Sequence, residues 1–166
     1  MSSEISAGGE VPTGADRLGA AVEDYQAAVN DFDREMARLL GVSETGLRCL
    51  EILVQHLPEA TPRQLADRLG LTTGSVTSLL DRLEGLGYVT RSAHPSDRRK
   101  LIVRATEAAT GRAWELIGPL IGDGQRLLAG YSAEQLDLIT DFLIRARGLQ
   151  EAHTGRLRPQ RPYPSA

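Results

Sequence analysis

The stretch TPRQLADRLGLTTGSVTSLLDRLEGLG, residues 61–87, decides the fold of this chain. Its first part predicts a short helix, because Thr61 can cap the helix, Pro62 suits the first turn and Gly70 can end it. Gln64 stands three residues after Thr61 and completes a capping box. A second helix follows, and its spacing turns four apolar side chains inward, namely Val76, Leu79, Leu80 and Leu83.

These two helices have the spacing of a helix-turn-helix. Ala66, Gly70, Val76 and Leu79 stand at offsets 0, 4, 10 and 13. That arrangement supplies a small residue where the helices touch, a glycine in the turn, and apolar positions that lock the second helix on the first. Any tight helical hairpin can produce part of this pattern by chance, so the spacing favours a helix-turn-helix without proving it.

After Gly87 the hydrophobic period changes to two. The runs YVTR (88–91) and LIVRA (101–105) alternate and are rich in β-branched residues. Nine residues join them and contain the turn sequence Pro-Ser-Asp, which predicts a hairpin with a long loop. A helix-turn-helix followed by a β-hairpin is a winged helix. The predicted fold class is therefore mainly α with a small β-hairpin wing.

A long helix is predicted before this core. Asp16 can cap it, Gly41 can end it, and its apolar residues recur at alternating spacings of four and three, as in a coiled coil. This seam consists of Leu18, Val22, Tyr25, Val29, Phe32, Met36 and Leu39. It is too long for one small winged helix to cover, so we expect it to pack on the last two helices and on a second subunit.

The remaining helices are predicted from their caps. Ser43 opens a helix that Pro58 stops, and Thr106 caps a long helix beyond the hairpin. Ser132 and Gln135 form a capping box at the start of the last helix. The residues of that helix expected to face inward are Leu136, Ile139, Leu143 and Ala146.

Composition places the chain among globular proteins. It has 166 residues, of which 41% are hydrophobic and 25% are charged. No apolar run approaches the ~18 residues of a membrane span, and the polar N-terminus has no apolar signal segment. We therefore expect a cytoplasmic protein without a membrane partner.

The net charge of -3 hides an uneven distribution. Residues 61–104 carry eight basic and four acidic side chains, whereas residues 1–60 carry four basic and eleven acidic ones. A locally basic segment in an acidic protein is an electrostatic footprint of nucleic-acid binding, although a charge run is more often only a solvated face.

The sequence offers no catalytic or metal-binding constellation. His56, His94 and His153 are scattered, and neither a ligand cluster nor a known catalytic motif is present. Cys49 is the single cysteine, and its apolar neighbours favour a buried structural role. We therefore expect no enzyme, no cofactor and no metal.

Residues 61–109 resemble the winged-helix core of the MarR family of bacterial transcriptional regulators. Most specific is the wing signature D-x-R-x-x-x-V-x-L-T, whose matching positions are here Asp97, Arg99, Val103 and Thr106. Ala105 departs from the pattern, since the family usually has leucine there. With the flanking helices, the resemblance covers residues 16–147.

The resemblance implies a two-fold homodimer whose first, fifth and sixth helices interdigitate. Such a dimer binds near-palindromic double-stranded DNA, with its recognition helices about one turn, ~34–36 Å, apart. The resemblance also implies a repressor that a small organic effector, often an aromatic acid or a phenol, releases from DNA. Candidate lining residues, each with an ordinary structural explanation as well, are Tyr25, Arg48, His56 and Trp114.

We accordingly expect one domain over residues 15–147, between a disordered tail at 1–14 and a disordered basic tail at 148–166. Within that domain the dimerisation helices occupy 15–40 and 107–147, and the winged helix-turn-helix lobe that binds DNA occupies 43–106.

The second helix of the helix-turn-helix is expected to enter the major groove by its N-terminal end. Short hydroxyl side chains there can bond to phosphates or base edges, and a helix N-terminus attracts anions. The candidates are Thr72, Thr73, Ser75, Thr77, Ser78 and Arg82. One of the two adjacent threonines is needed as the helix cap, and Arg82 can instead pair with Asp81 or Glu84.

The segment HPSDRRKLIVRAT, residues 94–106, completes the predicted interface. Its cations suit the minor groove, where arginine meets the most negative potential. The candidates are His94, Arg98 and Arg99 in this segment, together with Arg91 at the end of the preceding run YVTR. Asp97 is expected to fix the shape of the wing by pairing with Arg99, as the resemblance also implies. One alternative is a solvated charged hairpin, which the preceding helix-turn-helix disfavours, and the other is a winged helix that binds protein without DNA, which the cationic wing disfavours.

Overall fold

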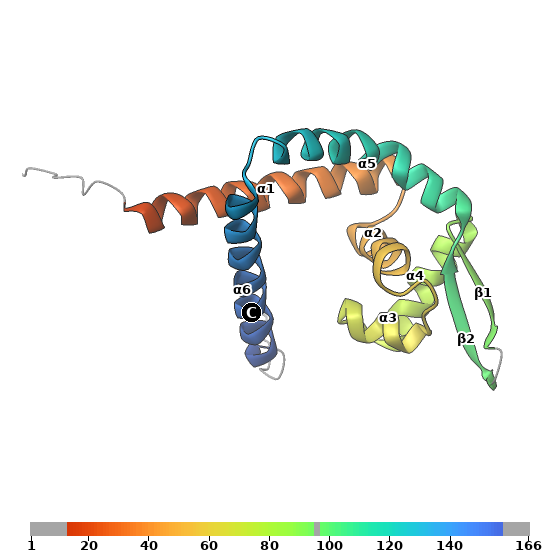
Figure 1. Ribbon diagram of the computed structural model, residues 1–166. Coiled ribbons are helices and arrows are strands. Elements are labelled where there is room, and N and C mark those ends of the chain that lie inside the picture. Colours follow the sequence, from red (N-terminus) through yellow and green to blue (C-terminus); the bar gives the residue numbers. More distant parts are fainter. Residues whose placement is uncertain (1–12, 95–96, 158–166) are drawn as a thin grey trace, which may run out of the picture. The chain divides into compact units, whose positions relative to one another are not determined.

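The computed structural model describes residues 13–94 and 97–157 (Figure 1). In chain order its elements are α1 (Gly14–Leu40), α2 (Glu44–Glu51), the π-helical turn η1 (Ile52–His56), α3 (Pro62–Leu69), α4 (Thr73–Gly85), β1 (Val89–His94), β2 (Asp97–Ala105), α5 (Glu107–Leu128) and α6 (Ala133–Leu157). The chain divides within α5 into two compact units, Met1–Leu116 and Ile117–Ala166. The predicted fold class, mainly α with one β-hairpin, is confirmed.

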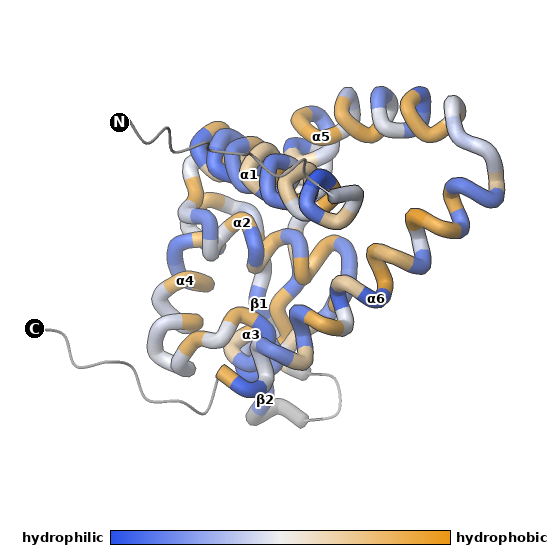
Figure 2. Tube along the Cα trace, turned by 90° about the vertical axis from the view of Figure 1, so that its left-hand side faces the viewer, coloured by the Kyte–Doolittle hydropathy of each residue, from blue (hydrophilic) through white to orange (hydrophobic). Residues whose placement is uncertain are grey.

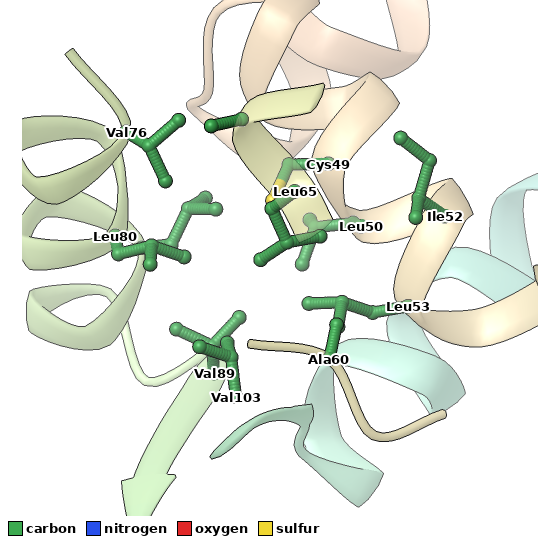
Figure 3. Packing of buried hydrophobic residues seen from close by; sticks show 12 residues of the cluster. Cys49, Leu50, Ile52, Leu53, Ala60, Leu65, Val76, Leu80, Val89 and Val103 are labelled. Carbon is green, nitrogen blue, oxygen red and sulfur yellow. The ribbon is translucent and has the colours of Figure 1, made fainter. Parts of the chain in front are cut away.

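One hydrophobic core holds the lobe formed by α2, η1, α3, α4 and the hairpin. Figure 3 shows its side chains converging from these elements, with Leu65 from α3, Val76 and Leu80 from α4, and Val103 from β2 all buried. Burying a Leu or Val side chain stabilises a fold by about 1.5–3 kcal/mol. The core therefore fixes one face of α4 and leaves its polar face outward.

The helix-turn-helix prediction is confirmed at both ends of α3. Thr61 and Gln64 form the capping box, in which the Gln64 N–H donates to Thr61 Oγ1 at 3.3 Å and the Thr61 N–H donates to Gln64 Oε1 at 2.8 Å. Gly70 ends the helix with φ +68°, a left-handed conformation that glycine adopts without steric cost. Ala66 is buried where α3 packs in the core. The turn at Gly70 then leads the chain into α4.

The wing is longer than the sequence predicts. Strands β1 and β2 are antiparallel, and their pairing continues through Ser92 with Ile102 and Ala93 with Leu101. The expected strands 88–91 and 101–105, with a nine-residue loop, were therefore too short. The reason is that backbone pairing needs no apolar alternation, and the added residues are mostly polar. Ala60 forms an isolated antiparallel β-bridge with Val103 through two backbone hydrogen bonds, of 2.7 and 3.1 Å.

Helix α1 differs from its prediction in its cap and in its buried face. Thr13, not Asp16, is the N-cap, and Asp16 is the third residue of a capping box with it. This places the first helical turn ahead of the expected start. The buried residues of the helix are Met36, Ala37 and Leu40. Most of the predicted seam therefore stays uncovered in the single chain, with Tyr25 68% exposed.

The second unit contains the C-terminal part of α5 and all of α6. Ser132 and Gln135 cap α6 as predicted, with hydrogen bonds of 2.8 and 3.2 Å. The helix continues to Leu157, so the expected disorder from residue 148 is wrong for 148–157. That segment has no proline, and its good helix formers outnumber its two glycines, Gly148 and Gly155.

Apart from buried Ala109 of α5, the apolar residues of α5 and α6 are at least partly exposed. Figure 2 shows hydrophobic positions recurring along both helices, and no residue of α6 is buried, including the four that we expected to face inward. Within the described residues, no helix combines the length and the apolar character that a membrane span requires. These side chains therefore form exposed apolar faces on amphipathic helices.

Candidate nucleic-acid interface

The outward face of α4 begins with a cluster of hydroxyl side chains. Val76, Leu80 and Leu83 anchor the opposite face in the core, each at most 1% exposed. The predicted residues Thr72, Thr73, Ser75, Thr77 and Ser78 are all exposed. The fold thus gathers these five side chains on the solvent side of one helix end.

Thr72 is the helix cap, as one of the two threonines had to be. Its Oγ1 accepts the Ser75 N–H at 3.2 Å and lies 2.9 Å from the Ser75 hydroxyl oxygen. Further along, the Thr77 hydroxyl donates to the Thr73 carbonyl oxygen at 2.9 Å, and the Ser78 hydroxyl to the Gly74 carbonyl at 3.3 Å. A hydroxyl that donates to its own helix still presents acceptor lone pairs outward.

Gly74 lies in the first turn of α4 without a conformational reason to be glycine. It is not among the described glycines with positive φ, and a Cβ built on it would meet nothing within 4 Å. The first N–H groups of a helix lack partners within the helix and favour anions. A residue without a side chain leaves them open to close approach, a feature that our sequence analysis missed.

Arg82 lies on the same helix but bonds toward the body of the lobe. Its guanidinium donates to the carbonyl oxygen of Gly41, at the end of α1, at 3.4 Å. The alternative partners considered from the sequence, Asp81 and Glu84, bind a different arginine. Arg82 therefore links α4 to the end of α1 in this structure.

Arg91 is that other arginine, and it joins β1 to α4. One terminal nitrogen lies 2.7 Å from Asp81 Oδ1, Nε donates to Glu84 Oε2 at 3.0 Å, and the second terminal nitrogen also contacts Glu84. Hydrogen bonding to Arg91 lowers the pKa of Glu84, and the two carboxylates raise the pKa of Arg91. The guanidinium that the sequence assigned to DNA thus has two protein carboxylates as partners.

The tip of the wing carries the other predicted cations. The backbone register pairs His94 with Asp97 where the strands meet. The side chains of His94, Asp97, Arg98 and Arg99 lie outside the described part of the chain. Their assigned roles, including the pairing of Asp97 with Arg99, therefore stay predictions.

Arg104 and Thr106 also hold the wing, and their contacts with Glu59, Ser92 and Gly87 were missed from the sequence. Arg104 pairs with Glu59 at 2.6 Å and donates to the Ser92 hydroxyl at 2.8 Å. Thr106 donates through its hydroxyl to the Gly87 carbonyl at 2.8 Å and also caps α5. The threonine that ends the wing signature therefore closes the base of the hairpin.

The candidate effector residues do not share one site. A groove of about 500 Å³ lies between α1 and α2, and of the four candidates only Arg48 lines it. The other lining residues are Ala27, Asn30, Asp31, Asp33, Arg34, Glu44, Leu47 and Glu51. Arg34 pairs with Asp31, and Arg48 with Glu51 at 3.0 Å. The groove is polar, with an excess of carboxylates.

Cys49 is fully buried in the core, as predicted. Burial raises the pKa of its thiol to about 11, so the reactive thiolate is scarce at neutral pH. Across the described residues, no three His, Cys, Asp or Glu side chains come together in a way that could hold a metal ion.

Comparison with known proteins assigns the family. The MarR family matches residues 42–101. The uncharacterized HTH-type transcriptional regulator YcgE of Bacillus subtilis (strain 168) is 36% identical over 127 residues, which are 76% of this chain and 82% of YcgE. These matches are to transcriptional regulators and not to enzymes, in agreement with the expectation from the sequence.

Solved structures share the fold. Streptococcus pneumoniae FabT in complex with DNA matches with a TM-score of 0.62 and 21% identity, over 80% of this chain and 97% of FabT. Wild-type apo MarR from E. coli matches with a TM-score of 0.55 and 21% identity, over 82% of this chain and 98% of MarR. The fold, the wing signature and the identity to YcgE lead to one conclusion: this chain belongs to the MarR family of transcriptional regulators.

Proposed function

We propose that this protein is a cytoplasmic repressor that binds a near-palindromic DNA operator as a homodimer and is released by a small organic effector. The observation that carries the proposal is the exposed hydroxyl cluster at the N-terminal end of α4, opposite a face anchored in the core. A recognition helix of this kind places its first turns against base edges in the major groove.

The chemistry of α4 supports sequence reading there. Thr77 and Ser78 donate to their own helix and so offer acceptors to the amino groups of cytosine and adenine. Rotation of the same hydroxyls turns them into donors for phosphate or guanine. Thr73 and Ser75, one turn earlier, are placed to meet the DNA backbone with the helix N-terminus. We assign base contacts to Thr77 and Ser78 and phosphate contacts to Thr72, Thr73 and Ser75.

The wing supplies the second contact in this proposal. The hairpin carries His94, Arg98 and Arg99 at its end, and a narrow minor groove attracts arginine. Asp97 acts within the wing, where it holds Arg99 in place. Because Arg91 bonds to two carboxylates of the lobe and Arg82 to the Gly41 carbonyl at the end of α1, the wing arginines are the main cationic contact that we propose.

Dimerisation accounts for the exposed apolar residues outside the lobe. Large hydrophobic side chains at least 50% exposed occur on α1, α5 and α6, among them Tyr25, Trp114, Leu127, Leu138 and Leu149. Exposed apolar surface of this extent marks an interaction site in a globular protein. A second copy of the chain is the occupant that also explains a two-fold operator.

Release by an effector needs a site whose occupancy favours a different spacing of the recognition helices. A ligand weakens DNA binding only by as much as it prefers that other state. The groove between α1 and α2 is a suitable place, because it joins a proposed dimerisation helix to the DNA-binding lobe. The test adds aromatic acids, phenols and organic cations to the complex with DNA. A compound that binds the free dimer should weaken operator binding, and failure of every such compound to do so removes this part of the proposal.

Selection from random duplexes tests the proposed DNA binding. Full-length protein should enrich a near-palindrome, and log K for the enriched duplex should fall linearly with log salt. Arg99→Ala should weaken binding at least tenfold while helicity stays unchanged. Enrichment of no sequence would return the chain to the alternative of a winged helix that binds protein.

A further inference from the structure

We propose that Asp81, Glu84 and Arg91 form a clamp that fixes the wing against the recognition helix, and that Arg91 acts by positioning and not by touching DNA. This inference rests on the proposed DNA binding and assigns a role to three residues within it. The argument starts from geometry. Asp81 and Glu84 lie one turn apart on α4, and Arg91 lies in β1 opposite Val103.

The contacts leave Arg91 little freedom. Its guanidinium donates hydrogen bonds to Glu84 through two nitrogens and pairs with Asp81 through a third at 2.7 Å. A forked arrangement of this kind fixes orientation as well as distance, which a single point charge does not. The side chain of Arg91 is 22% exposed, against 58% for Asp81 and 40% for Glu84. Arg91 is thus the inner member of the group.

The clamp spans the connection between α4 and the wing. Three residues connect α4 to β1, and one of them, Gly87, has φ +75°. This turn is the covalent hinge between the helix proposed for the major groove and the hairpin proposed for the minor groove, and buried Val89 and Val103 also hold the base of the hairpin. The ion pairs of Arg91 bridge that hinge from one side. Loss of the clamp should therefore misplace the wing arginines without unfolding the lobe.

The direction in which one substitution changes DNA affinity distinguishes this role from a purely electrostatic effect. Glu84→Gln removes a negative charge from the DNA-binding lobe, so electrostatics alone predicts tighter binding. The clamp predicts the reverse, a loss of about two- to fivefold in affinity for the selected operator, as expected for a partly exposed ion pair. Asp67→Asn is the matched control, because it removes an exposed carboxylate of α3 outside the clamp. It should bind as tightly as wild type or more tightly.

Substitutions of Arg91 test whether it contacts phosphate. Arg91→Gln should weaken binding and leave the slope of log K against log salt unchanged, whereas a lost phosphate contact lowers the slope by about one per subunit. Arg91→Lys keeps the charge but loses the fork, so it should weaken binding nearly as much. Combining Arg91→Gln with Glu84→Gln should add no further loss. A reduced slope, full rescue by lysine or tighter binding by Glu84→Gln overturns the clamp.

A measurement without DNA decides the clamp independently of the proposed function. Amide hydrogen exchange in the free protein should be faster in β1 and β2 of Glu84→Gln than in wild type, while α3 exchanges as before. Asp67→Asn should leave the hairpin unchanged. Equal exchange of the hairpin in Glu84→Gln and wild type contradicts the clamp. If wild-type protein binds no duplex, the DNA-binding proposal fails, and this exchange measurement still decides the clamp.

Discussion

Not every cation of the basic segment 61–104 is available to DNA. Arg91 and Arg104 pair with carboxylates of the lobe, and Arg82 donates to a backbone carbonyl. An arginine that pairs with a carboxylate contributes little to counterion release, because its charge is balanced before DNA arrives. Arg82 keeps its charge, because a backbone carbonyl is neutral. The affinity of the lobe for DNA therefore depends more on the wing tip and on helix N-termini than the local charge suggests.

Gly74→Ala should separate folding from DNA binding at a single residue. Alanine suits a helix better than glycine by up to about 1 kcal/mol, and a Cβ at this position meets nothing in the protein. If the first turn of α4 lies against DNA, the added methyl group must push the helix and the DNA apart. We expect a higher unfolding midpoint by thermal denaturation together with weaker operator binding in a titration.

The other end of α4 provides the matched control. Gly85 is also exposed, and a Cβ there would likewise meet nothing within 4 Å. Gly85→Ala should stabilise the helix and leave operator affinity unchanged, because this end points away from the proposed DNA surface. Equal operator affinities of Gly74→Ala and wild type would mean that the first turn of α4 is not close to DNA.

Cys49 should give the stability of the fold a particular dependence on pH. Its pKa is raised from 9.0 to about 11 in the folded protein, so between these values the unfolded chain loses a proton that the folded chain keeps. Stability must then fall as pH rises through that window, by a component of about 2–3 kcal/mol. Urea unfolding at pH 8 and pH 11 should show a smaller decline in Cys49→Ala than in wild type. An equal loss of stability in Cys49→Ala and wild type would mean that the thiol is in contact with solvent.

At the scale of elements, helix starts were more predictable than strand ends. The capping boxes at Thr61 and Ser132 involve residues three apart, so sequence spacing reveals them. The length of the hairpin depends on cross-strand backbone bonds that polar residues form equally well. The partners of Arg82 and Arg104 lie 41 and 45 residues away in the chain. Only the fold brings such pairs together.

The candidate site likewise contains one feature that the sequence predicts and one that it does not. The hydroxyl cluster of α4 follows from helical spacing once the buried face is known, and the structure places all five residues outward. The clamp did not follow from spacing, because Arg91 and Glu84 lie seven residues apart, on a strand and on a helix. The local excess of basic residues led to the prediction that Arg91 contacts DNA. The sequence did not reveal that the turn at Gly87 brings two carboxylates next to this arginine.

Tyr88 links the DNA-binding lobe to the end of α1. Its hydroxyl donates to the Leu40 carbonyl oxygen at 2.9 Å, and the ring is half-buried. Tyr88→Phe keeps the ring and removes this hydrogen bond, so it should lower the free energy of unfolding by about 1 kcal/mol in urea titrations. Tyr131→Phe, at an exposed position between α5 and α6, is the control and should have no effect. Unchanged stability of Tyr88→Phe would show that this bond does not hold the lobe to α1.

At the scale of the whole molecule, the exposed apolar faces are the basis of the proposed homodimer. Leu138 and Leu149 of α6 are 70% and 62% exposed in the single chain. We expect wild-type protein to sediment as a dimer at micromolar concentration and the double variant Leu138→Asp/Leu149→Asp to sediment as a monomer, because carboxylates resist burial in an apolar interface. Gln150→Asp, a polar position of the same helix, should stay dimeric. A monomeric wild type would exclude the proposed homodimer.

Hydroxyl-radical footprinting of the selected operator tests the central claim most directly, since it reports where each part of the protein lies on DNA. The account predicts two protected regions related by two-fold symmetry, with centres about one helical turn, ~34–36 Å, apart. Each should extend into an adjacent minor groove, and that extension should be lost with Arg99→Ala. A single protected region without a symmetric partner, or an unchanged footprint in Arg99→Ala, would contradict it.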